Sequence, residues 1–414
     1  MYLSKSSYNL VYMGIFGKKR VYMDFASSTP VSNEALKSFV LSESLTGNAF
    51  SIHKDGVACM DVLENAKKEI ASVMRGRPEE VFFFSSGTES DNVAIRGVFE
   101  RALRDGVKNP HAVTTTIEHE AVLGVFNELE KNGLSVSYIA PEENGVVDPR
   151  KIRDAMKKET VIVSVMYVNN ELGTIQNIKE ISKEIRHFRK NNPNRFESQR
   201  QDSVYPIFHT DACQATNFLS LDVPTLGFDM LTLNGAKCYG CKGSALLYVK
   251  KGLPIDPVFF SKGKKDISYG TPAVALSSSL AKSIQIACSL KDVEYKRIDK
   301  LNKYIREYVE KNPALKDRIV FTTKIEDTIP GTVHMLVKGI TGELVVIEMD
   351  ALGVSVSSQS ACREDSKEDS YVVKEIIKID SGWGTLRVSL GRTTSKKDCM
   401  FFLKCLEKVV NKYS

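Results

Sequence analysis

The amino-acid sequence predicts an α/β fold with a large, mostly parallel sheet and a second, smaller α+β domain. The first observation is an alternation of amphipathic helical segments with short, β-branched apolar runs between about residues 62 and 249. The second is a change of pattern after about residue 277, where one long helical segment precedes shorter strands. A chain of 414 residues, 42% of them hydrophobic, is long enough for two or three domains with cores of their own.

The first region is expected to supply the large sheet and its helical layers, because strands that alternate with helices build a parallel sheet covered on both faces. Its strands are predicted at residues 81–84, 112–116, 136–139, 161–168, 207–210, 230–233 and 245–249. Its helices are predicted at residues 62–74, 89–104, 120–131, 149–156 and 178–189.

The second region is expected to form the smaller domain. Its strands are predicted at residues 319–323, 332–337, 354–357 and 385–389, with helices at 344–352 and 396–412. The predicted organisation is a basic tail at 1–20, a large domain at 33–280 with an exposed polar insertion at about 191–206, and a small domain of 21–32 plus 281–414.

The composition narrows the function. The 57 Lys and Arg against 51 Asp and Glu give a net charge of only +6, so direct nucleic-acid binding is not expected. No apolar run approaches the roughly 20 residues of a membrane span. Eight irregularly spaced cysteines indicate reduced thiols and a cytoplasmic protein, although the basic residues 1–20 also fit a transit peptide to an organelle matrix. Cys238 and Cys241 have C-x-x-C spacing, but no second pair lies at zinc-ribbon spacing, so they are interpreted as structural thiols and no metal site is expected.

Polar clusters follow several predicted strands. Ser85–Glu89 comes after one strand and opens a helix, which favours either a phosphate site or a simple N-cap. Three further clusters follow other strands: Glu118-His119, Asn169-Asn170-Glu171 and Asp211-Ala212-Cys213-Gln214. Because ligands gather at the carboxyl ends of parallel strands, the clusters indicate one shared site.

A lysine completes the pattern. Lys237 follows the strand at 230–233 in Asn234-Gly235-Ala236-Lys237, where a lysine is either an ordinary surface residue or a Schiff-base nucleophile. Asp211 could pair with a protonated pyridine nitrogen. A phosphate cradle, a lysine and an aspartate together point to pyridoxal phosphate.

The order and spacing of these segments resemble the cysteine desulfurase family of fold-type I pyridoxal-phosphate enzymes, from Val21 to about Val410. The matching segments include Asp24–Pro30, Ser51–His53, Ser86–Asn92, Glu118–Val122, Asn169–Gly173, Asp211–Gln214, the Lys237 loop, Gly270-Thr271, Ser360–Cys362 and Arg387–Arg392. The resemblance implies a fold-type I transferase whose large domain binds the cofactor.

The resemblance also implies the role of each matched residue. Lys237 corresponds to the lysine that holds the cofactor as an imine and moves protons, Asp211 to the carboxylate on the ring nitrogen, and His119 to the imidazole stacked on the ring. Arg387 corresponds to the guanidinium that binds the substrate α-carboxylate. Thr271 corresponds to a phosphate ligand from the other subunit, which implies a homodimer. Further cofactor contacts are implied for five residues: Gly87, Thr88, Asn170, Gln214 and Asn234. Asn170 is also expected to contact the substrate.

Cys362 corresponds to the nucleophile that takes sulfur from L-cysteine, leaving alanine and an enzyme persulfide for sulfur-acceptor or scaffold proteins. The residues around it, 357–370, are polar and typical of a loop, as an exposed, reactive thiolate requires. The alternative interpretation of Cys362 is a small buried hydrophobic residue. The sulfur is expected to serve iron-sulfur cluster assembly or tRNA thiolation. The other cysteines, Cys213 included, are interpreted as packing residues, and four histidines as structural: His111, His187, His209 and His334.

The chain departs from the family pattern at three places. Ala236 stands where the family usually has His, the stretch 261–269 is rich in lysine, and Gln359 stands where a glycine usually precedes the Ser-Ala-Cys triplet. Two alternatives therefore remain at this point. One is another enzyme of the same fold, a selenocysteine lyase or an aminotransferase, and the other is a divergent scaffold of low activity.

Overall fold

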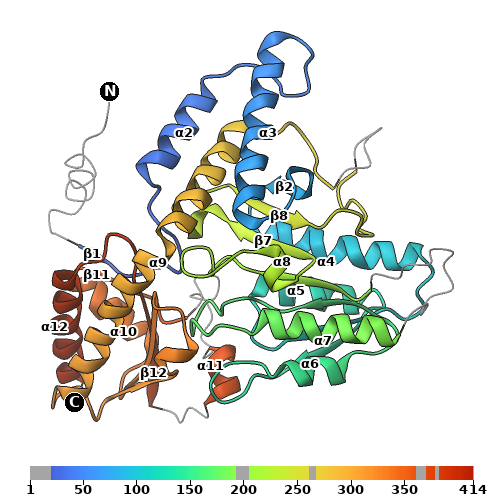
Figure 1. The fold of residues 1–414 in the computed structure, drawn as a ribbon. Coiled ribbons are helices and arrows are strands. Elements are labelled where there is room, and N and C mark those ends of the chain that lie inside the picture. Colours follow the sequence, from blue (N-terminus) through green and yellow to red (C-terminus); the bar gives the residue numbers. More distant parts are fainter. Residues whose placement is uncertain (1–19, 193–204, 261–266, 360–369, 378–381, 414) are drawn as a thin grey trace. The chain divides into compact units, whose positions relative to one another are not determined.

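The computed structural model describes residues 20–192, 205–260, 267–359, 370–377 and 382–413 (Figure 1). The contacts within the chain divide it into two compact units. Unit 1 comprises residues 1–28, 171–173 and 293–414, and unit 2 comprises residues 29–170 and 174–292.

Unit 2 is built on a seven-stranded sheet in the order β2-β8-β7-β6-β5-β3-β4. The strands from β7 to β4 run parallel, whereas β8 is antiparallel to both β2 and β7. Most positions of β3, β5, β6 and β8 are buried, which explains their continuous apolar runs. The strands are β2 (Val81–Phe84), β3 (His111–Thr115), β4 (Ser135–Ile139), β5 (Thr160–Ser164), β6 (Ile207–Asp211), β7 (Met230–Asn234) and β8 (Ala245–Val249).

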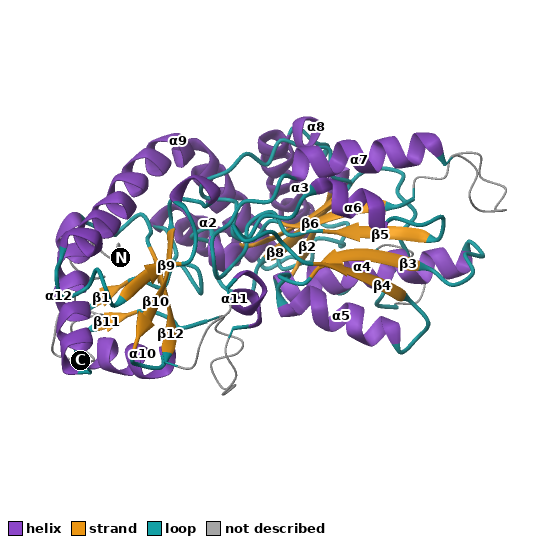
Figure 2. Cartoon of the chain, turned by 90° about the horizontal axis from the view of Figure 1, so that it is seen from below, coloured by secondary structure: helices purple, strands orange, loops and turns teal. Residues whose placement is uncertain are grey.

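Helices cover both faces of this sheet. Figure 2 shows α4 and α5 on one side of the strands and α6, α7 and α8 on the other. The fold class expected from the alternating pattern is therefore confirmed. The helices of unit 2 are α2 (Asn33–Glu43), α3 (Lys54–Met74), α4 (Gly87–Arg104), α5 (Glu120–Glu130), α6 (Pro149–Ala155), α7 (Ile178–Asn191) and α8 (Val223–Leu226), with 3₁₀ turns η1 (Pro78–Glu80) and η2 (Gly235–Lys237).

Unit 1 is a smaller α+β assembly with two sheets. One is antiparallel, in the order β12-β10-β9, and the other pairs β1 with β11 in parallel. The long helix α9 (Val274–Lys311) begins in unit 2 and ends in unit 1, because the division between the units falls at Asp292 and Val293. The other elements are β1 (Val21–Tyr22), β9 (Ile319–Phe321), η3 (Ile325–Asp327), β10 (Thr332–Lys338), α10 (Gly342–Ala351), β11 (Val354–Ser355), α11 (Tyr371–Ile376), β12 (Trp383–Ser389) and α12 (Lys396–Lys412).

The prediction of an exposed insertion at 191–206 is wrong at its C-terminal end. Tyr205 is buried, and its hydroxyl donates a hydrogen bond of 3.2 Å to Asp105. The carbonyl of Pro206 accepts a hydrogen bond of 3.0 Å from Arg189. These contacts satisfy polar groups of the segment inside unit 2, and polar composition alone could not reveal them. Residues 193–204 lie outside the described part of the chain.

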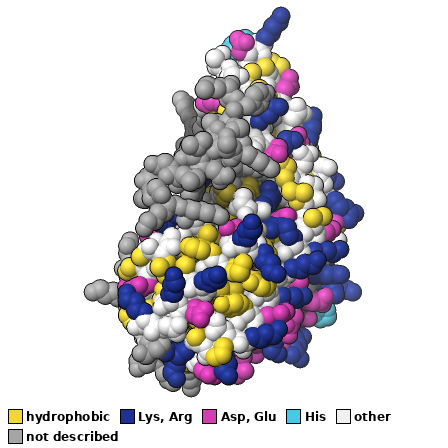
Figure 3. Space-filling view, turned by 90° about the vertical axis from the view of Figure 1, so that its left-hand side faces the viewer, with side chains coloured by type: hydrophobic (Ala, Val, Ile, Leu, Met, Phe, Trp, Pro, Cys, Tyr) yellow, Lys and Arg dark blue, Asp and Glu magenta, His cyan; other side chains and the backbone are white. Residues whose placement is uncertain are grey.

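The surface mixes charges of both signs. On the face shown in Figure 3, Lys and Arg side chains are interspersed with Asp and Glu and with hydrophobic side chains. Within the described residues, no helix combines the length and the apolar character that crossing a membrane requires.

Candidate functional site

The ends of three strands of unit 2 carry predicted site residues. Strand β6 ends at Asp211, and β7 ends at Asn234, directly before the η2 turn that holds Lys237. Strand β2 leads into α4, which begins at Gly87. Because β6 and β7 are parallel neighbours, with Asp211 paired to Thr232, their carboxyl ends lie side by side.

Cys213 connects these strand ends. Its amide donates a hydrogen bond of 2.9 Å to Oδ1 of Asp211, and a Cβ added to Gly87 would lie 3.2 Å from its Sγ. Burial raises the pKa of the Cys213 thiol well above its usual range, the nearby Asp211 adds to this, and Lys237 acts in the opposite direction. The structure therefore brings Gly87, Asp211 and Lys237 together around Cys213. The sequence interpretation of Cys213 as a packing residue missed this position.

The start of α4 fits a phosphate group. Ser86 is the N-cap, and its hydroxyl accepts a hydrogen bond of 3.1 Å from the amide of Glu89. The first amides of a helix have no carbonyl four residues back, so those of Gly87 and Thr88 face outward with the positive end of the helix dipole. A methyl group on Gly87 would also approach Nδ2 of Asn234 to 3.6 Å. The glycine thus keeps open a cradle that a side chain would fill.

The main chain around Lys237 is firmly anchored. The Asn217 side chain donates a hydrogen bond of 2.7 Å to the Lys237 carbonyl, and Oδ1 of Asn234 accepts one of 3.0 Å from the Ala236 amide. The Ala236 carbonyl accepts from both the amide and the hydroxyl of Thr29, at 2.8 and 3.0 Å. Ala236, which stands where the resemblance leads one to expect His, is therefore held through its backbone.

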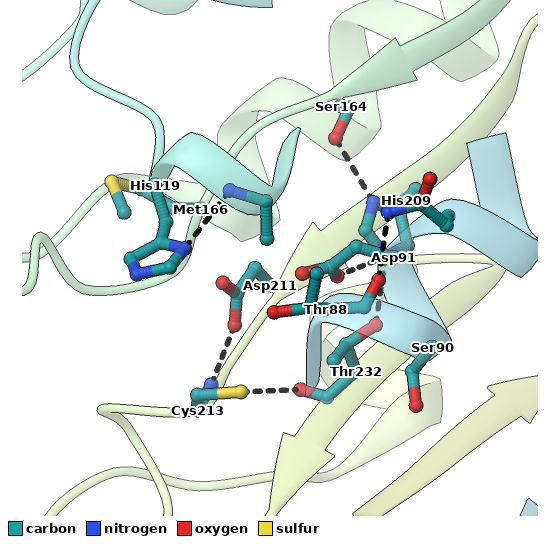
Figure 4. A network of polar contacts seen from close by, with 12 residues as sticks. Thr88, Ser90, Asp91, His119, Ser164, Met166, His209, Asp211, Cys213 and Thr232 are labelled. Atoms are coloured by element: carbon teal, nitrogen blue, oxygen red, sulfur yellow. Dashed lines mark hydrogen bonds and ion pairs between the residues drawn. The ribbon is translucent and has the colours of Figure 1, made fainter. Parts of the chain in front are cut away.

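His119 is fixed as the N-cap of α5. Its Nδ1 accepts a hydrogen bond of 3.1 Å from the Ala121 amide, so the ring proton lies on Nε2. Asn170 is 8% exposed and Gln214 is partly buried. In Figure 4, dashed lines join Asp211 to Cys213, Cys213 to Thr232, Thr232 to His209 and His209 to Asp91, and His119 lies nearby.

The acidic part of this network is buried. Oε1 of Glu118 accepts hydrogen bonds from the Thr115 hydroxyl (2.7 Å) and the Met166 amide (2.9 Å), yet burial raises the pKa of Glu118 to about 8. Burial, followed by the charge of Asp211, raises the pKa of Asp91 well above its ordinary value. Burial lowers the pKa of His209 to about 4, so its imidazole is neutral at physiological pH.

Asp91 was missed by the sequence reasoning, and His209 was interpreted only as a structural residue. Two periodicities carried a signal. Asp91 lies four residues after Gly87, on the same face of α4, and His209 lies two residues before Asp211, on the same face of β6. The sequence analysis considered the strand ends alone and did not use either relation.

Thr271 lies on the surface of unit 2 and lines a pocket of about 590 Å³. Ser85, Glu89 and Tyr269 contribute to the same pocket, and the Tyr269 hydroxyl donates a hydrogen bond to Glu89. The pocket therefore begins beside the start of α4. Of the lysine-rich stretch 261–269, residues 261–266 lie outside the described part of the chain.

Arg387 belongs to unit 1, on strand β12, and is 2% exposed. Its Nη2 donates hydrogen bonds to Oδ1 of Asp24 at 3.0 Å and to the Ser27 hydroxyl at 2.7 Å. On the neighbouring strand, burial and then the charge of Arg387 lower the pKa of His334 to about 3. The structure thus gives Arg387 an acidic and a hydroxyl partner within its own unit. Cys362 lies outside the described residues.

Comparisons with known proteins identify the family of the chain. The family model for class-V aminotransferases matches residues 21–402. A cysteine desulfurase IscS of Dictyoglomus turgidum is 34% identical over 400 residues, which cover 95% of each chain. A solved NifS-like protein superposes with a TM-score of 0.83 at 25% identity, covering 95% of this chain and 100% of that one. SspA, solved in complex with cysteine, superposes with a TM-score of 0.72 at 26% identity. The match covers 89% of this chain and 98% of that one.

Proposed function

The chain belongs to the cysteine desulfurase family of class-V aminotransferases, and on that basis we propose which of its residues carry out each part of the reaction. It is a pyridoxal-phosphate enzyme that releases sulfur from L-cysteine. The observation that carries the assignment of roles is the meeting of Gly87, Asp211 and Lys237 around Cys213 at the strand ends of unit 2.

The residues present fit the cofactor. Bound there, pyridoxal phosphate supplies an electron sink conjugated to the substrate nitrogen. The α4 amides at Gly87 and Thr88 would hold its phosphate, and the Asp211 carboxylate would pair with its ring nitrogen. His119 would contact the ring, and Nζ of Lys237 would bind the aldehyde carbon. Further polar contacts come from Asn170, Gln214 and Asn234.

The substrate steps are assigned to Arg387, Lys237 and Cys362. Arg387 binds the α-carboxylate of L-cysteine, and Asp24 and Ser27 orient its guanidinium group. Lys237 Nζ accepts and returns a proton at the substrate carbon chain. The Cys362 thiolate attacks the substrate Sγ, the substrate C–S bond breaks with its electrons on carbon, and that carbon takes up a proton. The products are L-alanine and a persulfide on Cys362.

The destination of the sulfur and the assembly are further parts of the proposal. We propose that acceptor or scaffold proteins take the persulfide sulfur for iron-sulfur cluster assembly or tRNA thiolation. We also propose a homodimer in which Thr271 of one subunit contacts the phosphate held by the other. All seven described cysteines are free thiols, which supports a reducing, cytoplasmic setting.

The reaction is tested on the purified holoenzyme with L-cysteine, by measuring alanine and sulfide. Wild type is expected to form one alanine for each sulfur released. A chain that converts cysteine without forming alanine would contradict the assignment.

The sulfur-accepting residue is tested by Cys362→Ser. We expect alanine formation to fall at least about 100-fold, because a hydroxyl is a far poorer nucleophile toward sulfur than a thiolate. Cofactor absorbance should stay unchanged. Mass spectrometry of wild type after reaction should find one added sulfur on the peptide that contains Cys362. The matched control is Cys241→Ser, which should keep wild-type activity. Sulfur on Cys238 or Cys241 instead would show that Cys362 is not the nucleophile.

A further inference from the structure

Asp91 is a buried acid to which the proposed reaction gives no role. It lies in the second turn of α4 and is 1% exposed. The same helix carries Gly87 and Thr88 at its start, so Asp91 lies one turn behind the phosphate cradle. An acidic side chain is almost never fully buried without a partner that compensates its charge.

The surroundings of Asp91 come from the strands on which α4 packs. Oδ1 of Asp91 lies 3.6 Å from Nε2 of His209 on β6, a side chain with no exposed surface. The same Nε2 lies 3.1 Å from the Thr232 hydroxyl on β7, and Nδ1 of His209 lies 2.9 Å from the Ser164 hydroxyl on β5. Figure 4 shows these side chains converging from separate strands beneath α4. His209 thus has a defined place between α4 and three strands.

The charges around Asp91 disfavour its ionised form. The titratable groups that face it are Asp211 and His209 from β6, Glu118 from the segment after β3 and the Cys213 thiol. Asp211 and Glu118 are acids, and His209 is kept neutral by its burial. The Asp211 carboxylate accepts a hydrogen bond from the Cys213 amide. Two carboxylates that share one site do not both ionise readily.

We propose that Asp91 is a positioning residue for the cofactor site: its buried carboxyl group, packed against His209, fixes α4 to β6. Helix α4 carries the phosphate cradle, and β6 carries the acid for the ring nitrogen. The contact between Asp91 and His209 therefore sets the relation between the two ends of the cofactor. This inference rests on the proposed cofactor site and extends it by two residues, Asp91 and His209.

The first test measures protons. In the folded chain Asp91 keeps its proton above the roughly pH 4 at which an exposed aspartate loses it. The folded state then binds one proton more than the unfolded state, so the stability due to Asp91 is full below about pH 4 and is lost as the pH rises. Asp91→Asn keeps the shape and cannot ionise. We expect the urea midpoint of the wild-type holoenzyme to fall relative to that of Asp91→Asn between about pH 5 and pH 7. The slope of the difference in unfolding free energy against pH should correspond to about one proton per chain.

The second test measures release of pyridoxal phosphate after dilution, followed by its visible absorbance. Asp91→Ala removes the contact with His209 and leaves a cavity between α4 and β6, so it should release the cofactor about tenfold faster. Asp91→Asn should restore the wild-type rate. The matched control is Arg96→Ala, an exposed position of the same helix, which should change neither the rate nor the pH dependence.

Two results would overturn the proposal. A stability difference between wild type and Asp91→Asn that does not change with pH would mean that Asp91 is ionised in the folded protein. Release from Asp91→Asn as fast as from Asp91→Ala would mean that the charge is required. If Asp91→Ala does not fold, the measurements on Asp91→Asn still decide. Neither readout involves sulfur chemistry, so a failure here is distinct from a failure to form alanine.

Discussion

Backbone anchors determine how Lys237 is presented. Its carbonyl is held by Asn217, and the residue before it is held by Thr29 and Asn234. None of these contacts uses the lysine side chain. Replacing that side chain should therefore remove its chemistry while the η2 turn keeps its shape.

Lys237→Ala is expected to abolish the visible absorbance that pyridoxal phosphate shows when its aldehyde carbon is bound to a lysine, because the variant has no amine at this strand end. The measurement is an absorption spectrum of the protein reconstituted with excess cofactor. Lys242→Ala, an exposed lysine five residues later in the same loop, serves as the control and should keep the wild-type spectrum. Unchanged absorbance in Lys237→Ala would refute the cofactor assignment.

The residue-level predictions rested on local context, and the structure brings three of the predicted residues together around Cys213. Lys237, Asp211 and Gly87 follow strands, and the position after a strand can be recognised in a linear sequence. Asp91 could not be found in that way, because it lies within a helix and its importance comes from β6, a distant part of the chain. The sequence identified Cys213 only as a member of a motif, since its contact with Gly87 depends on how α4 and β6 pack.

At the scale of elements, α4 combines two tasks. Its first turn offers amides to a phosphate, and its buried face packs on the sheet through Val93, Ile95 and Val98. Packing fixes the position of the helix start, and the glycine at that start leaves the space open. The cradle therefore depends on both the first turn and the buried face of this one helix.

Gly87→Ala tests the cradle. The added methyl group would lie 3.2 Å from Cys213 Sγ, and overpacking of about 1–3 kcal/mol should weaken cofactor binding about ten- to a hundredfold. Titration of the cofactor, followed by its absorbance, measures this. Gly124→Ala in α5, where an added Cβ meets nothing within 4 Å, is the control. It should leave affinity unchanged and stabilise the chain by about 0.5–1 kcal/mol. Equal affinity in both variants would contradict the cradle.

Strands and helices with many buried apolar residues were easier to predict from the sequence than exposed ones. The predicted strands of unit 2 correspond to real strands within a few residues, because strands covered on both faces show continuous apolar runs. The helix α2 was not predicted, since it buries only Ala35 and Ser42 and so shows no apolar stripe. The strand predicted over 161–168 ends at Ser164, although all residues from 161 to 168 are buried. Burial alone does not distinguish a strand from the buried loop that follows it.

At the scale of the whole molecule, the residues with proposed roles lie far apart in the sequence. The cofactor residues from Gly87 to Lys237 belong to unit 2, and Arg387 belongs to unit 1. Thr271 is exposed on the monomer, as a residue that serves another subunit would be. The sequence predicts domain boundaries at 32/33 and 280/281, and these remain predictions. The contacts within the chain divide it at 28/29 and 292/293.

Mixing two inactive variants tests the shared site. Thr271→Ala and Lys237→Ala should each be impaired alone. In a mixed dimer, one site receives Lys237 from one subunit and Thr271 from the other, so it is intact, and activity should return on subunit exchange. The control is Lys237→Ala mixed with the double variant Lys237→Ala/Thr271→Ala, which should stay inactive. If mixing restores nothing although exchange is complete, Thr271 acts within its own subunit.

The pairing of β1 with β11 has a consequence for protein synthesis. Val21 leaves the ribosome long before its partner Val354. The residues from Gly87 to Lys237 are all made in the interval. The cofactor pocket can therefore be assembled on the ribosome while the N-terminal strand still waits for its partner. Asp24 and Ser27 belong to the same early segment, so Arg387 meets its two partners only after the whole of unit 2 has been made.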